Sequence, residues 1–253
     1  MDDPSEPIRA GRRFLRSGWE SFDGKATDQS RGASPPPQQT HCPAGSRTVE
    51  LVPPERFRLG GMSVIDAIRS RRSRRKYAET PLGMEELSFL LWATQGVRKR
   101  GAVSSTRTVP SGGSRHGLET YVYAARVTGL DEGLYRYQPL DHALCHLRSA
   151  VGMHEDLARA LYGQSWNSAA VFAWTVVPYR MEWRYAAASH KILALDAGHV
   201  CQNLYLACES IGCGTCAIGA YDQVAMDGFL GVDGVDEATI YCAPVGKALR
   251  AGD

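Results

Sequence analysis

Three features of the apolar patterning predict an α+β fold for this chain of 253 residues. In residues 189–211, apolar side chains recur at steps of three to five, a stripe too long for a strand and typical of a buried helix, for which Ser189 is the expected N-cap. Residues 121–127 and 133–139 read as strands, and the glycine-containing loop between them predicts a hairpin. Residues 169–178 are so apolar that both faces must be covered, which indicates a central strand.

Length and composition favour one domain with an extension. A chain with 43% hydrophobic residues can bury a substantial core. The formal net charge of +2 is too small to require a nucleic acid or an anionic membrane as partner. No apolar run reaches the roughly 18 residues of a membrane span, and the first residues lack the apolar centre of a signal peptide. We therefore expect a cytoplasmic protein that binds neither nucleic acid nor membrane.

Residues 1–60 are expected to form a Pro-rich extension, and residues 61–253 the folded domain. The extension holds a basic and apolar piece at residues 12–19 and then a Gln/Ser/Pro segment with prolines at positions 35, 36 and 37. A flexible tail and an extended arm on the body or on a partner subunit both remain open. The composition changes at Ser63, where an amphipathic helix begins with Asp66 in its first turn.

The remaining elements follow from periodicity and from the residues that end each run. Residues 84–95 carry a helical stripe that Gly96 stops, and residues 98–108 read as a polar loop. Residues 110–117 form a loop of small residues that can bring backbone close to a ligand. The other expected elements, in chain order, are strand 142–147, helix 155–162, strand 215–218, the loop with Gly219 and Ala220, helix 222–230 and strand 239–245.

The cysteines predict neither a disulfide framework nor a redox site. Their number is odd and most lie in apolar runs, so they are expected to be reduced core residues: Cys42, Cys145, Cys201, Cys208, Cys213, Cys216 and Cys242. Cys213 and Cys216 form a CxxC motif, but it follows a helix instead of opening one, as redox use would require. For the same reason Gly212 and Gly214 are no dinucleotide fingerprint, and a Rossmann domain is not supported.

Two further site classes are not expected. A metal site is not expected because His190 and His199 lie nine residues apart, and no HExxH or paired CxxC motif is present. Ser111 is not expected to be a hydrolase nucleophile, because no GxSxG elbow surrounds it.

An arginine cluster is the strongest charge feature. Its basic residues within positions 69–76 are Arg69, Arg71, Arg72, Arg74, Arg75 and Lys76. The positive charges of these side chains repel one another unless an anion is present. A phosphate would accept bidentate hydrogen bonds from the guanidinium groups, with the Ser73 hydroxyl as a further donor. A solvated basic face, a phosphate site and a nucleic-acid patch all remain open on charge alone.

Four motifs in order make residues 63–246 resemble the nitroreductase superfamily of flavin enzymes. They are RRSRRKY, PSGG with RHGLETYVY behind it, LDAGHVCQNLYLA, and GTCAIGAYD before a C-terminal VG. The resemblance is closest to the SagB-type branch, which includes the azoline dehydrogenases of thiazole and oxazole peptide synthesis. It implies a nitroreductase-like fold with a central, mainly antiparallel sheet flanked by helices. It also implies a homodimer that has the long core helix at its interface.

The resemblance further implies one FMN at each of two sites between the subunits. The residues expected to hold its phosphate and ribityl chain are Arg71, Arg72, Ser73 and Arg75. Those expected to reach the flavin from the partner subunit are Pro110, Ser111 and Gly112. Those expected beside the isoalloxazine ring are Ile218, Gly219 and Ala220, and the supplementary phosphate residue would be Lys247 or Arg250.

The substrate prediction depends on one departure from the family pattern. Azoline dehydrogenases of this branch carry a Lys-Tyr pair, thought to act in proton removal, where this chain has Arg184 and Tyr185. An arginine stays protonated and cannot serve as a base, although it could bind an anionic substrate. With these two as candidate catalytic residues, we expect NAD(P)H-driven reduction of a small electrophilic acceptor, a nitroaromatic or quinone. The alternatives are a SagB-type dehydrogenase or oxidase of a peptide azoline or other natural product, and a basic nucleic-acid-binding module.

Overall fold

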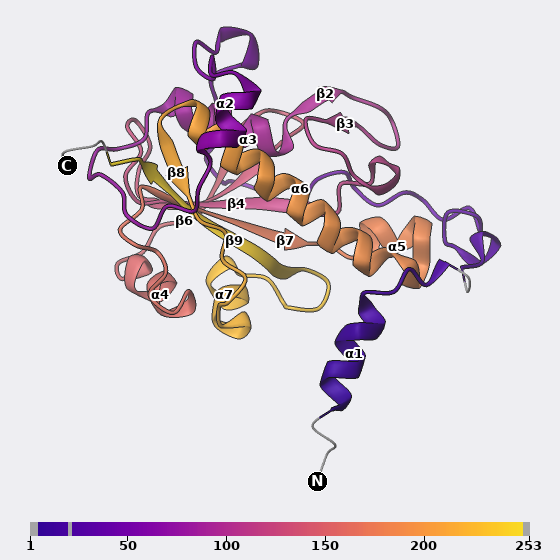
Figure 1. Ribbon diagram of the computed structural model, residues 1–253. Coiled ribbons are helices and arrows are strands. Elements are labelled where there is room, and N and C mark those ends of the chain that lie inside the picture. Colours follow the sequence, from indigo (N-terminus) through magenta and orange to yellow (C-terminus); the bar gives the residue numbers. More distant parts are fainter. Residues whose placement is uncertain (1–4, 20–21, 250–253) are drawn as a thin grey trace.

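The computed structural model describes residues 5–19 and 22–249 (Figure 1). One sheet has seven strands in the order β1-β6-β5-β4-β7-β9-β8, and all neighbours in it are antiparallel. The strands are β1 (Thr48–Glu50), β4 (Leu118–Ala124), β5 (Gly133–Gln138), β6 (Ala143–Arg148), β7 (Ala170–Val176), β8 (Cys213–Thr215) and β9 (Ala238–Lys247). A separate hairpin pairs β2 (Val97–Lys99) with β3 (Thr106–Arg107). With its flanking helices, this sheet confirms the predicted α+β fold.

Helices cover both faces of the sheet (Figure 1). α3 (Met84–Gln95) and α6 (Ser189–Ser210) lie on one face, and α4 (Met153–Ala160) and α7 (Gln223–Leu230) on the other. Successive side chains of β7 point to opposite faces of the sheet, as in any strand. Phe172 packs in the cluster with α3 and α6, whereas Val171 packs in the cluster with α4 and α7. The prediction that this strand is covered on both faces is confirmed.

The long core helix is present and begins one residue earlier than predicted. α6 has 22 residues, which corresponds to a length of about 33 Å. Ser189 was the expected N-cap, whereas it is the first helical residue and Ala188 holds the N-cap position. The reason is that α5 (Tyr179–Tyr185) and a 3-10 turn, Ala186–Ala188, lead directly into the helix. Leu193, Val200 and Leu204 are on its buried side.

Other element boundaries also differ from the prediction. β8 ends at Thr215, and Ile218 forms only an isolated bridge with Cys242, so the expected strand 215–218 begins and ends earlier. The β2–β3 hairpin, residues 97–107, occupies most of the expected polar loop 98–108. The helix expected at residues 155–162 is α4, which begins two residues earlier because Gly152 at its N-cap adopts a positive φ of 83°.

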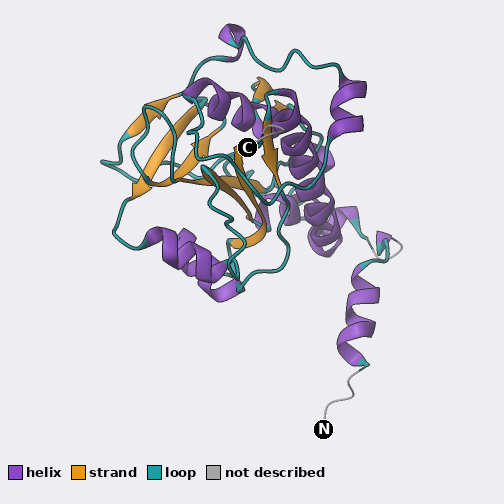
Figure 2. Cartoon of the chain, turned by 60° about the vertical axis from the view of Figure 1, so that its left-hand side comes forward, coloured by secondary structure: helices purple, strands orange, loops and turns teal. Residues whose placement is uncertain are grey.

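Two further helices lie before α3. α1 (Glu6–Phe14) projects from the body and has no buried residue (Figure 2). α2 (Val64–Ser70) starts at the N-cap Ser63, whose hydroxyl accepts a hydrogen bond from the Asp66 N–H. In the described ranges, 5–19 and 22–249, no helix is long and apolar enough to cross a membrane.

The described part of the chain between α1 and α2, residues 15–19 and 22–63, lies against the body. It includes β1, which the sequence did not predict and which pairs with β6, and two 3-10 turns, Gly24–Ala26 and Pro54–Arg56. The Gln29 N–H donates to the Trp183 carbonyl at 2.9 Å, and the Trp183 indole donates to the Ala33 carbonyl at 3.0 Å. This segment therefore meets α5, at the N-terminal end of α6.

One disulfide corrects the expectation that every cysteine is reduced. Cys42 is bonded to Cys145, across 103 positions of sequence. The pairing arises because Cys42 precedes β1, and β1 places Thr48 opposite Cys145 in β6. The remaining cysteines are buried free thiols. Burial raises the pKa of the Cys213 thiol to about 12, so this thiol of the CxxC motif is not the low-pKa thiolate that redox catalysis needs.

Candidate functional site

The arginine-rich segment that follows α2 lies beside β8. Ser73 forms a parallel bridge with Thr215, and the Arg74 N–H donates to the Thr215 carbonyl at 3.0 Å. Tyr77 closes the segment, because its hydroxyl donates to the carbonyls of Arg74, at 2.7 Å, and Pro244, at 3.1 Å. The arginines and the chain leading to Gly219, which are far apart in the sequence, therefore meet in the fold.

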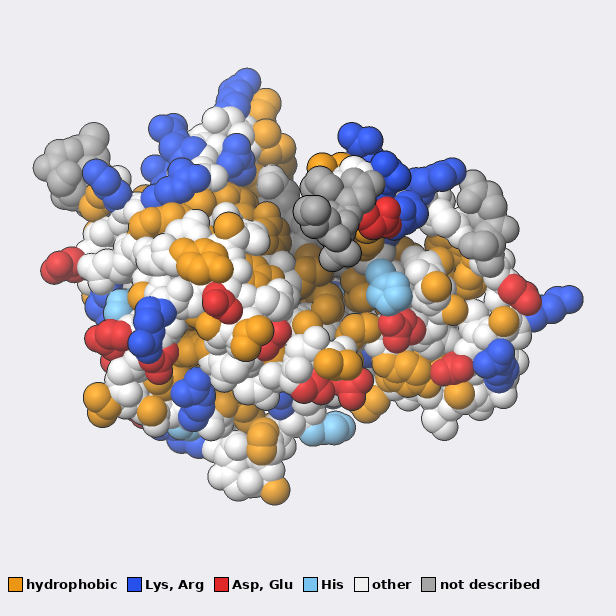
Figure 3. All heavy atoms as spheres, turned by 90° about the horizontal axis from the view of Figure 1, so that it is seen from below, with side chains coloured by type: hydrophobic (Ala, Val, Ile, Leu, Met, Phe, Trp, Pro, Cys, Tyr) orange, Lys and Arg blue, Asp and Glu red, His pale blue; other side chains and the backbone are white. Residues whose placement is uncertain are grey.

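Within this segment one arginine faces inward and three face outward. Arg74 pairs with Glu209 at 2.9 Å and packs so tightly on Gly214 that a Cβ there would lie 2.4 Å from its Cδ. Arg71 is half-buried, and Arg72 and Arg75 are exposed. The ion pairs described for residues 5–19 and 22–249 include none for these three side chains. On the face shown in Figure 3, Lys and Arg side chains gather in groups. The segment therefore offers guanidinium groups to an anion.

Two aromatic residues that the sequence analysis missed support these arginines. The Tyr205 hydroxyl lies 2.9 Å from Ser73 Oγ and accepts the Ala217 N–H at 2.8 Å. The Arg71 guanidinium lies over the Tyr205 ring at 5.3 Å, and Arg75 lies over the Trp166 ring at 5.7 Å. Tyr205 thus connects the arginine segment to the 215–218 segment. Its sequence signal is a hydroxyl within the apolar run of residues 204–208.

The backbone at positions 218–220 is fixed by hydrogen bonds at Ile218 and exposed at the two residues that follow. Ile218 and Cys242 exchange two backbone hydrogen bonds, of 2.7 and 3.1 Å, which fix the chain to β9. Gly219 and Ala220 are exposed. A Cβ on Gly219 would find its nearest neighbour, Tyr241, only at 4.0 Å. A flat ligand can therefore approach this backbone closely.

The loop with Pro110, Ser111 and Gly112 lies at the other end of α6. The Gly112 N–H donates to Asp196 Oδ1 at 3.4 Å, and the His116 N–H donates to Ser111 Oγ at 2.9 Å. Burial raises the pKa of Asp196, an effect opposed by its bonds to Ser111 and Gly112. Asp196 and Tyr205 are nine residues apart on the helix, about 13 Å along its axis. One chain therefore divides the predicted site residues between two clusters.

Arg184 and Tyr185 lie beside this second cluster. A Cβ on Gly113, whose φ is +57°, would lie 2.4 Å from the Tyr185 hydroxyl and 3.1 Å from Arg184 Nε. The Arg184 guanidinium is 5.5 Å from the Tyr185 ring centroid. Tyr185 is half-buried and Arg184 is exposed. The two candidate catalytic residues are thus neighbours of the loop with Gly112, and lie away from the arginine segment.

The turn after Tyr185 contains a strained residue. Ala186 has φ 43° and ψ −133°, a conformation that residues with a Cβ rarely adopt. Ala186→Gly is therefore expected to raise the free energy of unfolding by about 1 kcal/mol. Thermal and urea unfolding would measure the change. Ala187→Gly is the matched control because Ala187 has no positive φ, and it should lower stability; equal effects of the two changes would contradict the strain at Ala186.

The two supplementary phosphate candidates differ in what the structure describes. The Lys247 ammonium pairs with Glu86, a carboxylate of α3, and lies on β9 opposite Cys213. In this arrangement its charge is largely compensated within the chain. Arg250 lies outside the described residues.

Three comparisons agree on the family of the chain. Residues 68–247 match the family model described as the nitroreductase family. A nitroreductase relative from Methanocaldococcus jannaschii is 32% identical over 188 residues, which are 73% of this chain and 91% of that protein. A nitroreductase crystal structure from Ralstonia eutropha JMP134 superposes with a TM-score of 0.67 at 25% identity, covering 86% of this chain and 98% of that one.

Two more distant structures share the fold. The Escherichia coli microcin synthetase McbBCD complex, with truncated pro-MccB17 bound, matches at a TM-score of 0.61 and 17% identity, over 98% of this chain and 95% of that one. A nitroreductase from Desulfovibrio desulfuricans in complex with FMN matches at 0.53 and 16% identity, over 76% and 90% of the two chains. The family match covers most of the described fold, and the chain therefore belongs to the nitroreductase family of oxidoreductases.

Proposed function

We propose that the protein is an FMN-dependent oxidoreductase that uses NAD(P)H to reduce a small electrophilic acceptor, such as a nitroaromatic or a quinone. The observation that carries the proposal is the meeting of Arg71, Ser73 and Arg75 with the open backbone at Gly219. A phosphate dianion and a flat ring are the two features of FMN that such a site would take. When bound, FMN supplies hydride acceptance from a nicotinamide and transfer of two electrons to the acceptor.

The residues present fit this cofactor. Arg71, Arg72 and Arg75 carry positive charge without an ion-pair partner among the described residues, and Ser73 supplies a hydroxyl. Their arrangement suits the several oxygens of a phosphate. Gly219 leaves room at the backbone for an aromatic ring. Lys247 or Arg250 as a further phosphate contact stays a prediction.

Removal of Arg71 or of Arg75 is expected to weaken FMN binding. Arg71→Ala and Arg75→Ala should each cost about 1.5 to 3 kcal/mol, the range for a lost charge-assisted hydrogen bond, or roughly 10- to 150-fold in Kd. Quenching of flavin fluorescence on titration into apoprotein measures Kd. Arg159→Ala, an exposed arginine on α4, is the control and should leave Kd unchanged. Equal losses in all three variants, or binding of nucleic acid unaffected by FMN, would favour the basic binding module instead.

We also propose that the active form is a homodimer. The loop with Gly112 and the arginine segment contact α6 about 13 Å apart along the helix, so a second copy is needed to bring one chain's loop to the other chain's flavin. An exposed apolar surface on α2, with Val64 71%, Ile65 56% and Ile68 60% exposed, suits contact with another subunit.

The outward side of α6 supplies a test of the dimer. Leu195 is 54% exposed in one chain, and Leu195→Asp is expected to weaken the dimer by about 2 to 3 kcal/mol because it places a charge in the interface. Light scattering across a concentration series gives the dimer dissociation constant. Val224→Asp, on α7 and 82% exposed, is the control and should remain dimeric. A monomeric wild-type protein with FMN bound would contradict this assembly.

Anaerobic stopped-flow spectroscopy tests the proposed reaction. Mixing FMN-loaded protein with NADH or NADPH should bleach the flavin absorbance quickly, and a nitroaromatic or quinone should restore it. The chain's own contribution would be to place the acceptor against the flavin and to exclude water, with Tyr185 and Arg184 beside the loop at Gly113. Failure of both nicotinamides to bleach the absorbance would reject this reaction.

A SagB-type dehydrogenase or oxidase of a peptide azoline or other natural product is the second candidate. It is favoured by the extent of the match to the McbBCD complex, which covers 98% of this chain and whose structure holds a truncated pro-peptide. It ranks second because position 184 holds an arginine, a residue type that does not act as a base and so cannot take a proton from the substrate. Under this alternative the organic substrate alone would bleach the flavin, and Tyr185→Phe would slow that bleaching.

A further inference from the structure

A cavity of about 370 Å³ lies between the N-terminal segment and the turn that follows Tyr185. Its apolar and small lining residues include Phe14, Gly18, Phe22, Ala26, Ala186 and Ala187. Its titratable residues in the described part of the chain are Arg13, Arg16, Asp23, His190 and Lys191, of which Arg13 and His190 are paired with Glu6 and Glu182. The cavity is large enough for one or two aromatic rings, since about 150 Å³ already holds a benzene.

An aromatic cluster extends from this cavity to the loop at Gly113. The Trp19 ring lies 5.7 Å from the Tyr185 ring and 4.8 Å from the Phe22 ring, both edge to face. Phe22 also lies 6.3 Å from Tyr185 and lines the cavity. Three rings from two distant parts of the sequence therefore form one contiguous surface, whose far edge touches the loop through the Tyr185 hydroxyl. Trp19 remains 44% exposed, so part of this surface is accessible.

The segment that carries Trp19 and Phe22 is anchored to α5 and α6. Tyr179 donates to Asp28 Oδ2 at 2.9 Å, and Lys191 Nζ donates to the Leu15 carbonyl at 2.5 Å. These bonds join both sides of the aromatic pair to the body, in addition to the backbone bond between Gln29 and Trp183. Figure 1 shows the segment beside α5, where α6 begins. These bonds come from residues outside α1, so they hold the rings in place without this helix.

We propose that this cavity is a substrate subsite for a flat aromatic body, and that Trp19 and Phe22 determine its specificity. The inference rests on the proposed function, in which the loop with Gly112 reaches the partner's flavin. An acceptor that lies against Tyr185 then has its reacting end at the flavin and its remaining rings over Phe22 and in the cavity. Edge-to-face and stacked ring contacts favour an aromatic substrate over an aliphatic substrate of equal size. The substrate class is accordingly a quinone or nitroaromatic with two fused rings.

The test compares two acceptors in one set of variants. The ratio of the KM for a two-ring naphthoquinone to the KM for ferricyanide, which has no aromatic body, should rise about five- to tenfold in Trp19→Ala and Phe22→Ala. Phe22→Leu keeps an apolar side chain but loses the ring, so it should still raise the ratio. Trp19→Phe keeps a ring, so its ratio should stay close to the wild-type value. Tyr162→Ala, at an exposed tyrosine after α4, is the control. An unchanged ratio in both alanine variants would overturn the proposal.

A binding measurement separates failure of this subsite from failure of the proposed reaction. Calorimetry with 2-naphthol, which cannot accept electrons here, on FMN-loaded protein requires no turnover. Binding to the wild type that weakens about five- to tenfold in Phe22→Ala, and stays unchanged in Tyr162→Ala, supports the subsite even if NAD(P)H does not bleach the flavin. Absence of 2-naphthol binding to the wild type, or equal binding to wild type and Phe22→Ala, would contradict the subsite whatever the reaction.

Discussion

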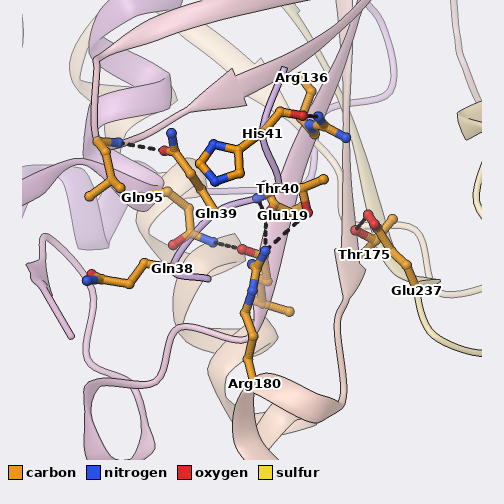
Figure 4. Close-up of polar contacts among 12 residues, drawn as sticks. Gln38, Gln39, Thr40, His41, Gln95, Glu119, Arg136, Thr175, Arg180 and Glu237 are labelled. Atoms are coloured by element: carbon orange, nitrogen blue, oxygen red, sulfur yellow. Dashed lines mark hydrogen bonds and ion pairs between the residues drawn. The ribbon is translucent and has the colours of Figure 1, made fainter. Parts of the chain in front are cut away.

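Glu119→Leu is expected to lower the free energy of unfolding by about 3 to 5 kcal/mol, the range for breaking a buried ion pair from one side. Glu119 Oε1 lies 2.5 Å from Arg180 Nη2 and accepts the Thr40 N–H at 2.6 Å (Figure 4). The two paired side chains are 2% and 3% exposed. Arg107 lies nearby, and burial lowers its pKa to about 10. Loss of the carboxylate would leave two buried guanidinium groups without their anion.

A double-mutant cycle separates the ion pair from the packing. Arg180→Met combined with Glu119→Leu removes both charges, so this double variant should be more stable than Glu119→Leu alone. Urea unfolding at a fixed FMN concentration gives the four free energies. The control is the exposed pair of Arg159 and Asp156, where Asp156→Leu should cost less than about 1 kcal/mol. A loss below about 1 kcal/mol in Glu119→Leu would show that the buried pair contributes little.

Acidification is expected to destabilise the protein through His116. This side chain is 6% exposed, and burial, together with the charges of Arg107 and Arg115, lowers the pKa of His116 to about 3. In the unfolded chain a histidine has a pKa of about 6.5, so the unfolded state binds the extra proton between about pH 6.5 and 3. Stability is therefore complete above about pH 6.5 and falls as pH decreases. At pH 4.5 the expected loss from this group is about 2 to 3 kcal/mol.

His116→Asn tests this source of acid sensitivity. His116 has a φ of 47°, and asparagine tolerates positive φ better than most residues, so the substitution keeps the backbone while removing the titrating group. Urea unfolding from pH 7 to 4.5 should show a smaller decrease for His116→Asn than for the wild type. His154→Asn, at a half-buried histidine of α4, is the control and should retain the wild-type decrease. Parallel pH profiles for wild type and His116→Asn would contradict a neutral buried His116.

The sequence was most informative where local patterning and burial agree. The stripe of residues 189–211 predicted α6 because a helix that packs on a sheet along most of its length must repeat apolar residues at helical spacing. Residues 169–178 predicted β7 because a strand covered on both faces needs apolar side chains at consecutive positions. The order of four motifs predicted the nitroreductase family, and the match of residues 68–247 to the model of that family confirms it.

Segments that depend on distant partners were not predictable in the same way. β1 has three residues and exists because β6 offers an edge to it, and the Cys42–Cys145 bond follows from that pairing. Short strands such as β8 are delimited by their partner, here Gly246 and its neighbours in β9, and not by their own composition. Boundary errors of a few residues in these elements have this common cause.

The sequence by itself determined the α+β class, the family and the set of residue types available to the site. The tertiary structure alone decided that Arg74 turns inward to Glu209 while Arg71 and Arg75 face outward, and that Tyr205 joins them to the 215–218 segment. It also decided that Trp19 and Phe22 lie against Tyr185. The physical reason is that side-chain direction and contacts between distant segments depend on packing across the whole chain, whereas periodicity records only which face of one element is buried.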